Sequence, residues 1–220
     1  MRPGEDQSVT REIIEGKLLA TVDEMGVVMG RTSMSPVIYE VLDFACGILT
    51  AEGELVAQMN GITLFTGTFG AQVQALIARF GETVAPGDVL LSNDPFAGGT
   101  HACDFAIVRP VFEGGRLAAW AINVAHYIDV GGSVPGSVAP DATSIFEEGL
   151  RLPGVKIVRD GTLSQELVSI IRENVRLPEI AMGDLNAQLA TVRIAERRVG
   201  EIVEKYGLAA LEDAFSFILD

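Results

Sequence analysis

The chain has 220 residues, 48% of them hydrophobic, which suits one large domain with its own core, and we expect a single domain over residues 1–220. Its formal net charge of −14 at pH 7 argues against nucleic acid and against anionic membrane surfaces as partners. There is no apolar run long enough for a transmembrane helix and no signal-peptide pattern, so we expect a cytoplasmic protein.

The first half of the chain predicts two helices around a hairpin. Apolar residues recur at helical spacing from Thr10 to about Arg31. The end of the segment Val37–Leu49 is typical of a strand, which turns at residues 51–53 and returns through Leu55–Gln58. The apolar stripe of Gly67–Phe80 then predicts a second helix, which the next glycine ends.

The second half is organised around a glycine-rich loop between two strands. Those strands are Val89–Leu91 and Phe105–Phe112, and the second returns as Leu117–Ala125. The later predicted elements are a long loop over residues 126–144, a strand at Val155–Val158, and helices over Ser164–Val175 and Asp184–Tyr206. Because hairpins are mixed with helices, the sequence predicts an α+β fold, with a mixed, mainly antiparallel sheet and flanking helices.

The loop Asn93–Asp104 contains one of only two histidines in the chain. If the two strands after it form a hairpin, His126 returns to the sheet edge that carries His101 and Asp104. Two imidazoles and a carboxylate at one edge suit a divalent metal ion with open positions for water, and Asp43 could supply a fourth ligand. The alternative is that each histidine only satisfies hydrogen bonds of its own loop.

Other polar residues near this loop have simpler explanations. Asp94 precedes a proline, where an aspartate commonly bonds its own backbone in a turn. Cys46 and Cys103 are too few for a disulfide framework, so we expect reduced thiols, and a small buried thiol is the commoner role for Cys103. The glycine pair Gly98–Gly99 could cradle a phosphate, but no Walker lysine follows it.

Several motifs in these regions recur together in one known family. They are Asn93–His101, Ala125–His126 with Asp129–Gly132, Phe146–Arg151 and Gly183–Gln188. Between Arg11 and Gly207 the chain resembles the hydantoinase B and oxoprolinase family in the order of these motifs. It departs from the usual pattern at Phe96, at Ala102–Cys103 and at Tyr127, and these departures concern the substrate pocket rather than the ligands.

The resemblance implies a metal-bearing subunit that works with an ATP-using, hydantoinase A-like partner. Members of the family hydrolyse cyclic amides such as hydantoins, 5-oxoproline or lactams, or carboxylate ketones such as acetone and acetophenone. The metal ligands of the family map onto Asp43, His101, Asp104 and His126, for one zinc, iron or manganese ion. The ATP and its magnesium belong to the partner subunit.

The mechanism that the resemblance implies divides the work between two subunits. The partner uses ATP to activate the amide, and metal-bound water in this chain attacks it. Asp129 or Asp94 could relay the proton, so we take Asp94, Asp129 and His126 as candidate catalytic residues. The alternatives are a subunit of an ATP-dependent ketone carboxylase and, from a different class, a non-catalytic scaffold.

The family's chains usually continue far beyond this point, so the sequence resembles an N-terminal part. A separate polypeptide could supply the remainder. The last thirteen residues are rich in apolar side chains, including Leu211 and Phe215, and we expect them to be exposed as an interface for such a partner.

Overall fold

The computed structural model describes residues 3–220 and contains one seven-stranded sheet. The strands are β1 (Phe44–Thr50), β2 (Leu55–Gln58), β3 (Val89–Ser92), β4 (Asp104–Glu113), β5 (Arg116–His126), β6 (Val155–Arg159) and β7 (Thr162–Leu163). Their spatial order is β2-β1-β5-β4-β3-β6-β7, and each neighbouring pair is antiparallel. The predicted α+β class with a mainly antiparallel sheet and flanking helices is confirmed.

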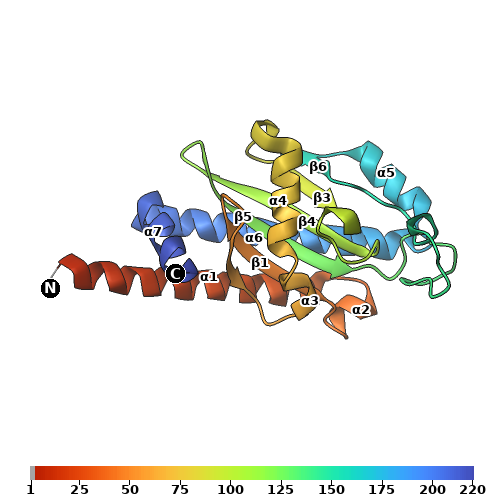
Figure 1. Cartoon of the computed structure of the whole chain (residues 1–220), viewed down its shortest axis with the longest axis horizontal. Coiled ribbons are helices and arrows are strands. Elements are labelled where there is room, and N and C mark those ends of the chain that lie inside the picture. Colours follow the sequence, from red (N-terminus) through yellow and green to blue (C-terminus); the bar gives the residue numbers. More distant parts are fainter. Residues whose placement is uncertain (1–2) are drawn as a thin grey trace.

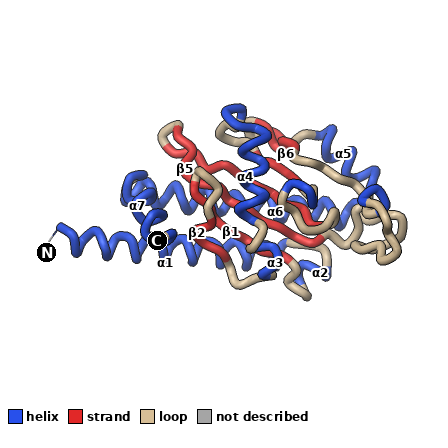
Figure 2. The backbone as a smooth tube through the Cα atoms, in the orientation of Figure 1, coloured by secondary structure: helices blue, strands red, loops and turns tan. Residues whose placement is uncertain are grey.

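Helices cover both faces of this sheet (Figures 1 and 2). They are α1 (Pro3–Thr32), α2 (Pro36–Tyr39), α3 (Thr63–Thr66), α4 (Phe69–Phe80), α5 (Gln165–Asn174), α6 (Pro178–Tyr206) and α7 (Leu208–Leu219). Figure 1 shows α4 crossing the front of the sheet, whereas α6 runs behind it. Short 3-10 turns lie at Gly81–Thr83 (η1), Pro95–Ala97 (η2) and Ile145–Glu147 (η3).

The larger core lies between the sheet and the long helices α1 and α6. In α1 the buried side chains recur every three or four residues, at Ile14, Leu18, Val22, Met25 and Met29. This spacing gives the helix one apolar stripe, which packs on the sheet and on α6. The predicted helix over Thr10–Arg31 is therefore present, although it begins seven residues earlier, at Pro3.

A smaller core lies on the opposite face, beneath α4. Phe69, Val73 and Leu76 of α4 are buried against side chains of the central strands, among them Trp120 of β5. The helix ends at Gly81, whose φ of 46° is a backbone conformation that favours glycine. The sequence predicted this end of the helix correctly.

The central hairpin fixes which residues meet at one edge of the sheet. Asp104 at the start of β4 pairs directly with His126 at the end of β5, and Phe44 of β1 pairs with Ala125. Asp43, one residue before Phe44, therefore falls in the same row as His126 and Asp104. Alternation along each strand directs these three side chains to the face that α3 and α4 cover.

The C-terminal segment corrects an expectation from the sequence. Residues 208–219 form helix α7, which packs against α1, and the side chains of Leu211 and Phe215 are buried there. Asp213 on the same helix accepts two hydrogen bonds of 2.6 Å from Arg11 of α1. The apolar residues of this segment are spaced at helical intervals, and most of them cover α1, so only Phe217 and Leu219 remain substantially exposed.

Within residues 3–220, every helix falls short of the length and hydrophobicity that crossing a lipid bilayer requires.

Candidate metal centre

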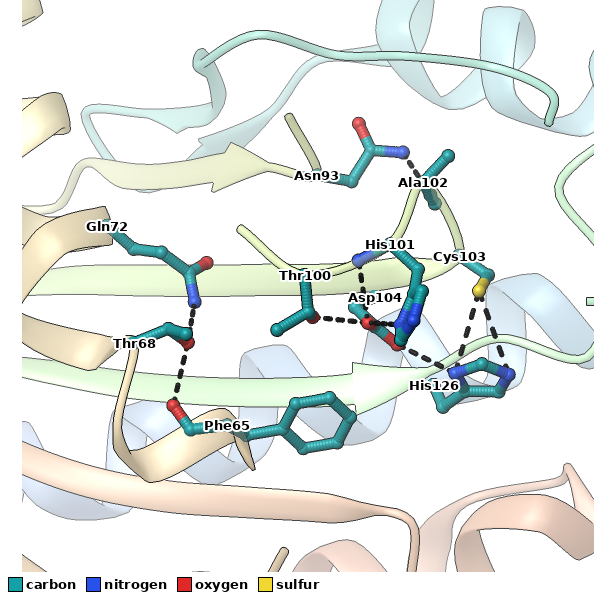
Figure 3. A network of polar contacts seen from close by, with 10 residues as sticks. All are labelled: Phe65, Thr68, Gln72, Asn93, Thr100, His101, Ala102, Cys103, Asp104 and His126. Carbon is teal, nitrogen blue, oxygen red and sulfur yellow. Dashed lines mark hydrogen bonds and ion pairs between the residues drawn. The ribbon is translucent and has the colours of Figure 1, made fainter. Parts of the chain in front are cut away.

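Asp104 is the central residue of a polar cluster at the edge of the sheet. Its Oδ2 accepts hydrogen bonds from the Thr100 hydroxyl and from the backbone N–H of His101, and lies 2.7 Å from Nδ1 of the same histidine. Its Oδ1 lies 2.7 Å from Nδ1 of His126. The carboxylate side chain is only 1% exposed. Figure 3 shows Asp104 between the two imidazole rings.

His101 is carried by a tight loop that the sequence singled out. Asp94 accepts a hydrogen bond from the N–H of Phe96 and begins the 3-10 turn η2. Gly98 has a φ of 86°, and a Cβ there would lie 2.8 Å from the backbone carbon of Ala71 in α4, so the loop needs glycine to approach that helix. The loop holds His101 with half of its side chain exposed to solvent.

His126 is more deeply placed than His101, with 13% of its side chain exposed. Its backbone N–H donates to the carbonyl of Asp43, which attaches the end of β5 to the start of β1. Cys103 Sγ lies 3.5 Å from its Nδ1 and 3.7 Å from its Nε2. Four residues, His101, Cys103, Asp104 and His126, each offer a possible ligand atom, and these atoms lie within 4.8 Å of one another.

The electrostatics of the cluster favour a charged pair. Burial opposes ionisation of Asp104, but its hydrogen bonds from His126 and Thr100 together outweigh burial and lower its pKa below 3.8. Burial likewise opposes protonation of His126, yet the hydrogen bond and the charge of Asp104 raise its pKa above 6.5. Burial, followed by the negative charge of Asp104, raises the pKa of the Cys103 thiol, which therefore keeps its proton.

Asp43 lies next to this cluster but makes no side-chain hydrogen bond to any described residue. Partial burial raises the pKa of its carboxyl, while the nearby charges of His126, Asp104 and His101 also act on it. Leu42, the residue before it, has a φ of 60° and a half-exposed side chain. A left-handed leucine is strained, and such strain is typical of segments that present functional groups.

The structure separates the other two candidate catalytic residues from the cluster. Asp94 serves its own turn, as described above. Asp129 is buried, and its carboxylate accepts hydrogen bonds from the N–H groups of Gly131, Gly136 and Arg176, at 3.0, 3.3 and 3.0 Å, and from Arg176 Nη1 at 2.8 Å. Burial opposes ionisation of Asp129, but these bonds outweigh it and lower the pKa. Its contacts tie the long loop to the segment before α6.

Two buried amides support the cluster, and the sequence analysis assigned neither of them a role. Asn93 donates to the carbonyls of Ala102 and Leu150 and accepts from the N–H of Leu152, so it joins the histidine loop to a segment nearly sixty residues later. Gln188 of α6 donates to the carbonyl of Phe105 and accepts from the Tyr127 hydroxyl. The only available signal was position, since Asn93 directly follows a buried strand.

The family model that describes hydantoinase B/oxoprolinase matches residues 7–220. The chain belongs to the hydantoinase B/oxoprolinase family. The caprolactamase subunit beta of Pseudomonas jessenii is 32% identical over 200 residues, covering 91% of this chain and 34% of the relative. The 5-oxoprolinase of Dictyostelium discoideum is 32% identical over 212 residues, covering 93% of this chain and 17% of the relative.

Two solved structures share the fold of this hydantoinase B/oxoprolinase chain. The ATP-dependent caprolactamase from Pseudomonas jessenii matches with a TM-score of 0.90 and 29% identity, over 96% of this chain and 36% of that one. Nucleotide-free acetone carboxylase matches with a TM-score of 0.91 and 25% identity, over 97% of this chain and 28% of that one. The chain thus spans about a third or less of the length of each of these relatives.

The residues present fit the metal ion that membership of the hydantoinase B/oxoprolinase family implies. The cluster offers imidazole and carboxylate groups, which suit zinc, iron and manganese. Asp104 now holds two imidazole nitrogens at 2.7 Å, where a divalent cation can replace shared protons. The half-exposed ring of His101 leaves one side of the cluster open to solvent, as a catalytic rather than a purely structural site requires.

The shifted pKa values predict how the metal-free hydantoinase B/oxoprolinase chain responds to pH. Asp104→Asn should cost about 1 kcal/mol more stability near pH 5.5 than near pH 8.5, measured by urea unfolding after chelation. The contribution of His126 is complete below its ordinary pKa of 6.5 and is lost as pH rises through the raised, folded value. That of Asp104 is complete above 3.8 and is lost as pH falls through the lowered value.

A second buried carboxylate provides the control for this pH experiment. Asp88 lies 2.7 Å from the ammonium of Lys156 and is as buried as Asp104. A lysine ammonium stays charged between these two pH values, so Asp88→Asn should cost the same at both. An equal cost of Asp104→Asn at both pH values would contradict the assigned ion pair.

Proposed function

We propose that this chain is the metal-bearing part of an ATP-dependent enzyme that hydrolyses cyclic amides, as hydantoinases, oxoprolinases and lactamases do. One observation carries the proposal: Asp104 lies between two imidazoles at an open edge of the sheet, in a chain of this family. Two relatives named as a caprolactamase subunit and a 5-oxoprolinase support the substrate class.

The residues that would hold one zinc, iron or manganese ion are Asp43, His101, Asp104 and His126. When bound, the ion supplies Lewis-acid activation of water or of a carbonyl oxygen. Resonance makes the carbonyl of a cyclic amide a poor electrophile, so activation by ATP has a clear chemical purpose. We assign ATP and its magnesium to a hydantoinase A-like partner subunit, because this chain has a net charge of −14 and no Walker motif.

The chain's own residues position the reacting groups. Asp104 fixes both imidazole rings through its two oxygens, and the buried side of the cluster excludes water behind His126. His101 faces solvent, from which the substrate would arrive. For Asp94 and Asp129 we propose structural roles in place of proton transfer, since each carboxylate is committed to hydrogen bonds within its own loop.

A ketone carboxylase is the alternative, and its support is the likeness to acetone carboxylase over 97% of the chain. The same cluster would then hold the oxygen of a ketone-derived substrate. A non-catalytic scaffold is weaker, because a scaffold has no need of an open cluster of imidazole and carboxylate groups. In the first two cases we expect a hetero-complex, with an ATP-using subunit and a polypeptide corresponding to the remainder of the longer relatives.

The test is reconstitution with an ATP-using subunit and a polypeptide that corresponds to that remainder. We expect ATP-dependent ring opening of 5-oxoproline, hydantoin or caprolactam, with no bicarbonate incorporated. Calorimetry of this chain alone should show no micromolar ATP binding. Incorporation of labelled bicarbonate into acetone, without ring opening, would favour the carboxylase. Tight ATP binding by the isolated chain would contradict the division of roles.

A further inference from the structure

Arg151 is held between two exposed aromatic rings beside the metal centre. Its guanidinium carbon lies 5.9 Å from the centre of the Phe96 ring and 5.8 Å from that of Phe146. The two phenylalanines are 78% and 83% exposed, unusually high values for such large apolar side chains. They come from two separate 3-10 turns, η2 and η3, which converge on this one arginine.

The backbone on either side of Arg151 is fixed to the loop that carries His101. Asn93 is fully buried and donates to the carbonyl of Leu150, accepts from the N–H of Leu152 and donates to the carbonyl of Ala102. The N–H of Leu150 also donates to the carbonyl of Val130. Both neighbours of Arg151 are therefore anchored, and one amide links them to the residue that follows His101.

The guanidinium of Arg151 has no ion pair or hydrogen bond with any described residue. The neighbouring acid Glu147 is engaged elsewhere, because it accepts hydrogen bonds from the N–H groups of Thr143 and Ser144. A guanidinium with rings near it keeps its N–H groups free, and these groups match the oxygens of a carboxylate or phosphate. In a chain of net charge −14, such an uncommitted cation beside the metal centre calls for an anionic ligand.

We propose that Arg151 recognises an oxyanion of the substrate, either a carboxylate or the phosphoryl group of an ATP-activated intermediate. Phe96 and Phe146 hold the guanidinium for this purpose. The proposal rests on the proposed function only in naming the anion as part of the substrate. The anion site itself is a property of this chain and can be measured without turnover.

The test follows the side-chain Nε–Hε resonance of Arg151 by NMR in this chain, at constant ionic strength. Inorganic phosphate and acetate are titrated separately. We expect a saturable shift with one or both anions. Preferential saturation by phosphate identifies the phosphoryl group, and preferential saturation by acetate identifies a carboxylate. Arg151→Gln should abolish saturable anion binding by calorimetry, and Arg151→Lys should weaken it about tenfold, because lysine lacks the planar fork.

Arg159 provides the matched control, since it is exposed, forms no printed ion pair with described residues and lies at the end of β6. Arg159→Gln removes the same charge and should leave anion binding unchanged. Phe146→Leu keeps the arginine but removes one ring, and should weaken binding several-fold. A linear, unsaturated response equal to that of Arg159 would overturn the proposal, even if ring opening is observed. So would unchanged anion binding in Arg151→Gln with loss of subunit assembly, which would indicate a protein interface.

Discussion

His101→Ala is expected to remove the metal ion while leaving the fold intact. Second-shell changes alone weaken metal sites by about 10–100-fold, so loss of a ligand should weaken this one by more than about 100-fold. The imidazole is half exposed in a loop and carries little packing, so far-UV circular dichroism should not change. Elemental analysis of protein prepared without chelator should fall from about one ion per chain to nearly none.

Two further variants decide which residues complete the ligand set. Asp43→Ala should lose the ion, because its carboxylate makes no side-chain hydrogen bond to the described residues and lies beside both histidines. Cys103→Ala should keep it, because burial and the charge of Asp104 hold the thiol in its protonated form. The reverse result would replace Asp43 with a thiolate ligand and favour zinc over manganese. A stoichiometric ion in His101→Ala would refute the assigned centre.

Asn93→Ala is expected to destabilise the chain by about 3–5 kcal/mol. The change leaves the carbonyls of Ala102 and Leu150 and the N–H of Leu152 without their partner in a buried position. Each buried group left unsatisfied costs about 1–3 kcal/mol. Urea unfolding followed by circular dichroism measures the effect directly.

The control for this variant is an asparagine with one exposed bond. Asn174 donates only to the carbonyl of Ile170 near the end of α5, and its side chain faces solvent. Asn174→Ala should cost less than about 1 kcal/mol. If Asn93→Ala cost no more than this control, Asn93 would not hold the two segments together, and the positioning of Arg151 would need another explanation.

Local pattern was enough to predict most of the sheet. The glycine pair 114–115 and the alternation of the flanking strands predicted the β4–β5 hairpin, and its register placed Asp104 opposite His126. Helix starts were less well predicted, since α6 begins at Pro178 and not at Asp184. The proline favours a helix start, which the sequence analysis passed over. The C-terminal residues were counted as apolar without regard to their helical spacing, so the burial of Leu211 and Phe215 was missed.

The part of the centre that could not be read from the sequence depends on contacts between distant segments. Cys103 was expected to be a buried thiol, and it is, but its approach to His126 depends on how the loop folds back. Asp129 looked available because its partner Arg176 lies 47 positions later. Asn93 and Arg151 belonged to separate motifs, and only the folded chain shows that one positions the other.

The spacing of the ligands along the chain sets the order in which the centre assembles during folding. Asp104 and His126 lie 22 positions apart on one hairpin, whereas Asp43 joins them from roughly eighty residues before His126. Closing a longer loop costs more entropy, and distant contacts form later than local ones. The hairpin therefore brings two imidazoles and a carboxylate together before β1 docks. An ion captured at that stage would favour the correct pairing of β1, since a shift of one residue would turn Asp43 to the opposite face.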